Sequence, residues 1–166
     1  MGYGETHPGV ARCYHAMGTI QNLLRNHNEA LESFYKSLEI RLEIFGEGHE
    51  DVASSYNGMG NAYKFQHQPE ESIEMFEKSL KIHQKLFREE HAGVATCYNN
   101  IGTIYDSLQD YDKALQYLKM ALEIRLKILA PDHPDIQASY YNLGKLYIHQ
   151  KMGKDALECF TRCLSL

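Results

Sequence analysis

Residues 46–66 read GEGHEDVASSYNGMGNAYKFQ, and their pattern of His, Val, Tyr and Gly returns at a fixed interval along the chain. The interval is 42 residues, because 49 − 7, 91 − 49 and 133 − 91 are equal for His7, His49, His91 and His133. The same step joins the tyrosines Tyr14, Tyr56, Tyr98 and Tyr140 and the glycines Gly18, Gly60, Gly102 and Gly144. A fixed period in this range is typical of stacked supersecondary units rather than of a compact fold around one catalytic pocket.

Each repeat contains two apolar patterns with the period of a helix. The first forms one stripe, which in the first two repeats consists of Val10, Tyr14, Met17, Gly18 and Gln21, then Val52, Tyr56, Met59, Gly60 and Tyr63. A mid-helix glycine costs up to about 1 kcal/mol relative to alanine, so its recurrence predicts a neighbour too close for a Cβ atom. The second pattern places a small residue before larger apolar ones, as in Ala30, Phe34, Leu38 and Leu42, then Ser72, Phe76, Leu80 and Leu86, then Ala114, Leu118, Leu122 and Leu126.

Short polar segments separate the two patterns, as in NHNE (26–29), HQPE (67–70) and QDYD (109–112). We therefore expect an all-α protein of eight helices, each about 15–19 residues long, in four antiparallel hairpins. The expected repeats are 4–45, 46–87, 88–129 and 130–166, within a single domain of residues 1–166. Because the last repeat is truncated, we expect the chain to be a piece of a longer protein.

These residues resemble the tetratricopeptide repeat, whose pattern is W-x2-L-G-x2-Y followed by A-x3-F. The fourth repeat reads Tyr140-x2-Leu143-Gly144-x2-Tyr147 and then Ala156-x3-Phe160. Tyr replaces the family's Trp, and the period is 42 residues instead of the usual 34. The longer second helix and its exit loop are similar to those of kinesin light chains. The resemblance implies a right-handed α-solenoid whose first helices line a concave surface.

Composition excludes several classes of function. The net charge is −5 and no Lys/Arg-rich run occurs, which argues against a nucleic-acid partner. No apolar stretch is long enough to cross a membrane, and no signal peptide is present. The four cysteines, Cys13, Cys97, Cys159 and Cys163, are best interpreted as reduced thiols of a cytoplasmic protein.

The sequence predicts neither an enzyme nor a metal site. No nucleophile elbow, phosphate-binding glycine loop or HExxH motif is present. The four loop histidines recur once per repeat, roughly 20 Å apart, whereas zinc needs its ligands around one point. We expect these histidines to cap helices and pack loops. Cys159 and Cys163 have the i, i+4 spacing of metal ligands, but no further ligand is near them in the sequence.

The side of each first helix that faces away from the core is the candidate binding surface. On a helical wheel these positions point about 80–160° away from the core tyrosine. Asparagine suits such a surface because its amide can both donate to and accept from a peptide backbone. We take as candidate ligand-binding residues Arg12, His15, Thr19, Asn57, Asn61, Lys64, Asn99, Asn100, Thr103, Asn142, Lys145 and His149.

Two functions remain open at this point. One is a scaffold or adaptor that binds an extended, acidic peptide segment of another protein, since Arg12, Lys64 and Lys145 outnumber the single acid Asp106 on this surface. The clamp of the chaperone-tail-binding members is not matched, because the matching positions hold His15, Thr19, Gly58, Thr96 and Asn100 and lack its basic residues. The other is an architectural spacer that associates end to end through the uncapped last helix, where Leu157, Phe160 and Leu164 have no following helix.

Overall fold

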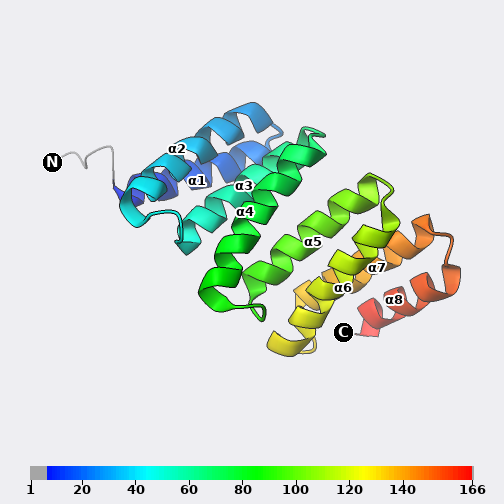
Figure 1. Cartoon of the computed structure of the whole chain (residues 1–166). Helices are drawn as coiled ribbons and strands as arrows, with labels where there is room; N and C mark the ends of the chain where they lie inside the picture. Colours follow the sequence, from blue (N-terminus) through cyan, green and yellow to red (C-terminus); the bar gives the residue numbers. More distant parts are fainter. Residues whose placement is uncertain (1–6, 166) are drawn as a thin grey trace. The chain divides into compact units, whose positions relative to one another are not determined.

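The computed structural model describes residues 7–165, and this part of the chain consists of eight helices without a strand (Figure 1). The helices are α1 Pro8–Leu23, α2 His27–Phe45, α3 Glu50–Phe65, α4 Pro69–Phe87, α5 Ala92–Ser107, α6 Tyr111–Ile128, α7 Pro134–His149 and α8 Gly153–Ser165. The predicted all-α class and the four hairpins are confirmed. The predicted lengths hold for seven helices, while α8 has 13 residues. Residues 4–6 of the first predicted repeat and Leu166 lie outside the described residues.

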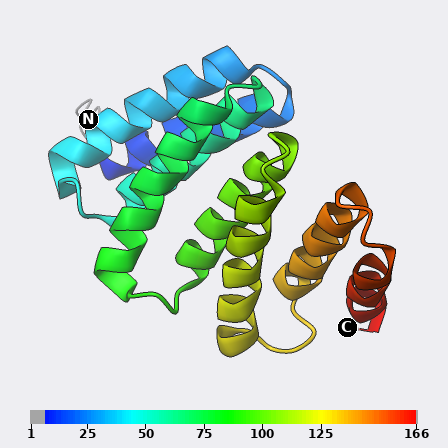
Figure 2. The ribbon, with the colours of Figure 1, turned by 45° about the vertical axis from the view of Figure 1, so that its right-hand side comes forward.

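The chain forms two compact units, which divide between Leu86 and Phe87. In the first unit α1 packs against α2, α2 packs against α3, and the two first helices α1 and α3 are neighbours. In the second unit α5, α6, α7 and α8 repeat this order, with α5 beside α7 (Figure 2). Each unit therefore contains two repeats and places the first helices of those repeats next to each other.

The turn within each hairpin has the same conformation in all four repeats. One residue of each turn has a φ between 59° and 64°, namely Arg25, His67, Gln109 and Lys151. In the first hairpin the next amide, Asn26 N, donates to Gln21 O at 2.8 Å, and Arg25 N donates to Asn22 O at 3.1 Å. These two bonds form the Schellman motif, which satisfies the last carbonyl groups of the first helix. The motif lets the second helix begin within three residues of the end of the first.

The repeated glycines lie where the two helices of a hairpin touch. A Cβ atom built on Gly18 or Gly60 would lie 2.9 Å from the ring of Phe34 or Phe76, respectively. In the second unit Gly102 meets Leu118 and Gly144 meets Phe160 in the same way. The prediction that these glycines mark close helix approach is confirmed. In addition, a Cβ atom built on Gly58 of the following repeat would lie 2.5 Å from the same ring of Phe34.

A buried arginine joins the two repeats of each unit. Arg41 is 4% exposed, and its Nη1 group donates to Asp51 O and to Ser55 Oγ, both at 2.8 Å. In the second unit Arg125 donates to Asp135 O at 3.0 Å and to Ser139 Oγ at 2.7 Å. The set returns after two periods, because 125 − 41 equals 84. One period after Arg41, Asp51 and Ser55, the equivalent positions hold His83, Gly93 and Cys97.

Three apolar residues that were expected to face inward are exposed, so these expectations were wrong. Met17 is 48% exposed because no described helix covers the outer side of α1, whereas the equivalent Met59 is buried against α2. Leu126 and Leu86 are about half exposed near the ends of their helices. Next to Leu126, Arg125 is the residue that faces inward, because its guanidinium group reaches carbonyl and hydroxyl groups of α7.

We expect Gly58→Ala to lower the free energy of unfolding by about 1–2 kcal/mol, measured by urea denaturation. The added methyl group would press on Phe34, which is 1% exposed and also lies close to Gly18. The better helix propensity of alanine, worth up to about 1 kcal/mol, offsets only part of this cost. Gly48→Ala is the control, because no atom lies within 4 Å of its virtual Cβ. An unchanged or higher stability of the Gly58→Ala protein would contradict the close contact.

Candidate functional site

The four loop histidines cap the first helix of each repeat. His7 Nδ1 accepts from Gly9 N at 3.0 Å, and His49, His91 and His133 accept in the same way from the second residue of their helices at 3.1 Å. The rings of His49 and His91 also stack on Phe45 and Phe87, with ring centres 4.2 and 4.0 Å apart. The expectation of a capping and packing role is therefore confirmed. Within residues 7–165 no group of three or more potential ligands could hold a metal ion.

The surface of the candidate residues is best defined in the second unit, where α5 and α7 lie side by side. Asn142 Nδ2 donates to Asn99 Oδ1 at 2.9 Å, so the two amides join the two first helices. Within residues 7–165, the Nδ2 group of Asn99 and the Oδ1 atom of Asn142 have no hydrogen-bond partner. The pair therefore presents one N–H donor and one acceptor in a fixed relation.

A second polar link lies two helical turns further along the same helices. His149 Nδ1 is 2.7 Å from Asp106 Oδ1, and the ring of Tyr111 lies tilted beside the imidazole. Lys145 is exposed on α7 between Asn142 and His149 in the sequence. Asn100 and Thr103 lie on α5, where Thr103 Oγ1 donates to Asn100 O at 2.8 Å. The structure therefore connects α5 and α7 at two points of the candidate surface and leaves an exposed ammonium group between them.

In the first unit the candidate residues lie on α1 and α3. Arg12 and Thr19 are exposed on α1, while Asn57, Asn61 and Lys64 are half-buried on α3. His15 is drawn toward α2, because its ring meets the edge of Phe34 and its Nδ1 lies 3.3 Å from Arg41 Nη1. Burial lowers the pKa of His15, and the positive charge of Arg41 lowers it further. Only part of the His15 ring is thus available to a ligand.

Several contacts were not anticipated from the sequence. The pairs Asn99–Asn142 and Asp106–His149 are each 43 residues apart, one more than the repeat, because adjacent first helices are staggered by about one position. Tyr35 and Tyr63 bring their hydroxyl groups to 2.8 Å, and burial together with this hydrogen bond raises the pKa of Tyr63 to about 12. The other repeats have no tyrosine at the position equivalent to Tyr35, so the repeat pattern could not predict this contact.

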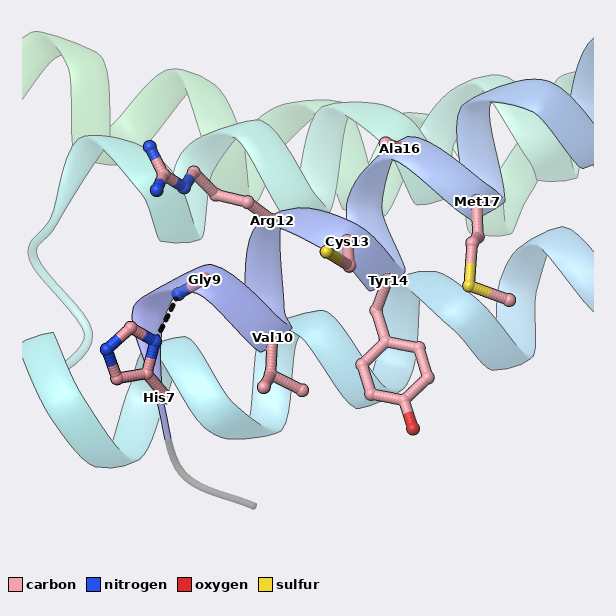
Figure 3. A pocket seen from close by; sticks show the side chains of 8 residues that line it. All are labelled: His7, Gly9, Val10, Arg12, Cys13, Tyr14, Ala16 and Met17. Carbon is pink, nitrogen blue, oxygen red and sulfur yellow. Dashed lines mark hydrogen bonds between the residues drawn. The ribbon is translucent and has the colours of Figure 1, made fainter. Parts of the chain in front are cut away.

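A second candidate surface is the outer side of α1 (Figure 3). Val10, Tyr14 and Met17 project from one side of this helix and line an open hollow of about 820 Å³, to which Arg12 and Cys13 also contribute. Their equivalents in α3 are covered by α2, as are those of α7 by α6. This side of α1 therefore has the shape and polarity of a surface that receives a second helix of the repeat type.

Other features agree with the sequence expectations. All four cysteines are free thiols. No described helix combines the length and the apolar character that crossing a bilayer requires.

Comparison with protein families gives one match. The sequence model of the tetratricopeptide repeat matches residues 20–85, 51–127 and 108–166, which overlap and together run from 20 to 166. A comparison with curated proteins finds no match.

Solved structures share the fold over nearly the whole chain. BtubC (BKLC) from P. vanneervenii is 26% identical, with a TM-score of 0.85 over 96% of this chain and 64% of that one. The nearly identical TPR-like repeats of a kinesin-light-chain-type protein from Podosopora anserina are 22% identical, with a TM-score of 0.81 over 96% of this chain and 75% of that chain. The apo form of RapI has 23% identity and a TM-score of 0.79 over 92% of this chain and 54% of that chain. The chain thus spans less than two thirds of BtubC and of RapI. These likenesses support the kinesin-light-chain-like type of helical repeat.

We expect His49→Ala to lower the free energy of unfolding by about 1 kcal/mol, because the amide of Asp51 loses its acceptor. His49→Asn supplies another side-chain acceptor at this position and should lie closer to the native protein. Urea denaturation with and without added zinc provides the measurement. A stabilisation by zinc that His49→Ala removes would show a metal role and contradict the capping interpretation.

Proposed function

The chain belongs to the tetratricopeptide repeat family, and we propose that it is a scaffold or adaptor module whose first helices bind an extended segment of a partner protein. The observation that carries this proposal is the Asn99–Asn142 pair, in which two amides hold each other at 2.9 Å. The pair spans two neighbouring repeats, so a ligand that contacts it lies across the helices and not along one of them.

The chemistry of the pair suits a peptide backbone. Asn99 offers an N–H donor and Asn142 a carbonyl acceptor, which match the C=O and N–H groups of an extended chain. Because the amides already bind each other, little side-chain freedom is lost when a ligand arrives. Recognition through the backbone depends weakly on the ligand's side chains, and the surrounding residues must supply the selectivity.

The charges near the amides favour an acidic segment. Lys145 is exposed beside Asn142, whereas the carboxylate of Asp106 is engaged by His149. In the first unit Arg12 and Lys64 occupy the corresponding face of α1 and α3. Such charges mainly increase the rate of association and select among partners, and their effect decreases with salt.

We expect Asn99→Ala to weaken a bound acidic peptide roughly tenfold, which corresponds to the loss of one or two hydrogen bonds. A screen of extended acidic, neutral and basic peptides identifies the ligand, and fluorescence anisotropy measures its affinity for each variant. Asn57→Ala tests the equivalent amide of the first unit. Gln116→Ala is the matched control, since this exposed amide lies on α6, away from the first helices.

The proposal is wrong as placed if Asn99→Ala and Asn57→Ala bind every ligand found as well as the native protein does. A preference for basic peptides would leave the amide contact intact but contradict the acidic ligand.

A second candidate function is self-association of an architectural array. It is favoured by exposed apolar residues on α8, where Leu157 is 68% and Leu164 is 88% exposed. Their equivalents Leu31 and Leu38 pack inside the first unit against α3. The outer side of α1 resembles the surface of α3 against which Leu31 and Leu38 pack. A second copy can therefore place α8 on α1 and reproduce the contact between repeats.

We expect the apparent mass in light scattering to increase with protein concentration, and Leu164→Glu to suppress the increase. Thr161→Glu is the control, because it introduces the same charge at an exposed polar position of α8. A constant monomeric mass over the whole range would rule out association through this helix.

A further inference from the structure

Three lysines of α4 line a hollow that the peptide-binding proposal does not use. Lys78, Lys81 and Lys85 follow one side of α4, and the hollow of about 320 Å³ is closed by Tyr56 of α3 and by the loop of Glu47 and Gly48. All of these residues belong to the first unit. The hollow is therefore lined by residues of α3, of α4 and of the loop between repeats, and none of them is a candidate peptide-binding residue.

Two of these lysines have no ion-pair partner. Lys78 Nζ binds Glu74 Oε1 at 2.7 Å and lies 5.7 Å from the centre of the Tyr56 ring. The pair with Glu74 is about half exposed, so it is weak and can exchange. Lys81 and Lys85 make no ion pair with any residue in the described part of the chain. Glu47 is the one acid in the described lining, which therefore holds three cations against one anion, with Glu74 paired to Lys78 beside it.

The same hollow occurs one repeat later with the opposite charge. There it is lined by Glu89, Glu90 and Glu123 together with Lys127, and Tyr98 takes the place of Tyr56. Lys127 bridges Glu90 at 3.5 Å and Glu123 at 3.2 Å. The repeat geometry thus makes the hollow, but folding does not require lysines in it. The lysine cluster is specific to α4.

We propose that this hollow binds a phosphate monoester. A phosphate carries close to two negative charges and three acceptor oxygens, which matches three ammonium groups that each act as a point charge. A carboxylate carries one charge and is better recognised by the planar fork of arginine, which the hollow lacks. The Tyr56 ring forms an apolar wall for the carbon atoms that bear the phosphate.

The test is a titration of the whole chain with inorganic phosphate, followed by amide chemical shifts and compensated with sodium chloride to constant ionic strength. We expect saturable shifts at Glu47, Gly48 and residues 78–85, with millimolar affinity. The double variant Lys81→Gln/Lys85→Gln should weaken binding roughly tenfold. Glu47→Gln should strengthen it, because one repelling carboxylate is removed. Lys127→Gln is the control in the equivalent hollow and should leave the shifts unchanged.

Two further probes distinguish the source of the phosphate. Acetylated and amidated phosphoserine represents a phosphorylated side chain, and glycerol 3-phosphate represents a lipid headgroup or metabolite. Tighter binding of either one identifies the source and supports the site. The proposal fails if phosphate shifts these amides no more than chloride does, or if the Lys81→Gln/Lys85→Gln protein binds phosphate as tightly as the native protein does. Loss of peptide binding by Asn99→Ala leaves this result untouched, so the two proposals fail separately.

Discussion

Each helix pair depends on one contact, in which a large apolar side chain of the second helix rests on a glycine of the first. Phe34 shows the constraint most clearly, because its ring lies so close to Gly18 and to Gly58 that neither position has room for a methyl group. The missing side chain weakens each first helix by up to about 1 kcal/mol, and the tight packing of the aromatic ring offsets that loss. Since the contact fixes both the distance and the rotation of the two helices, it also decides which residues face outward.

The rotation fixed in this way produces the candidate surface. The glycine of each first helix faces the second helix of its own repeat, and residues about 80–160° away from the core tyrosine turn from the core. In the second unit these residues include Asn99 on α5 and Asn142 on α7, which the neighbouring helices bring within hydrogen-bond distance. A packing requirement in the interior is thus accompanied by a repeated polar surface that lies outside the core.

The repeating residues made most of the fold predictable from the sequence. His7, His49, His91 and His133 marked the helix starts, and the glycines marked the helix contacts. The burial of single residues and the contacts between repeats were harder to predict. Met17 carries the same pattern as Met59, yet only Met59 is covered by another helix, because burial depends on the neighbouring repeat and not on the residue itself. The candidate surface was predicted residue by residue, but its cross-links were not, since the stagger between first helices adds one residue to the period.

The buried arginine limits how repeats of this kind can follow one another. Arg41, Asp51 and Ser55 return as Arg125, Asp135 and Ser139, while the equivalent positions one period after the first set hold His83, Gly93 and Cys97. Two kinds of junction between repeats therefore alternate in this chain. Inserting or removing a single repeat would place an arginine against a helix without the matching serine, whereas inserting or removing two repeats, or 84 residues, would keep every match.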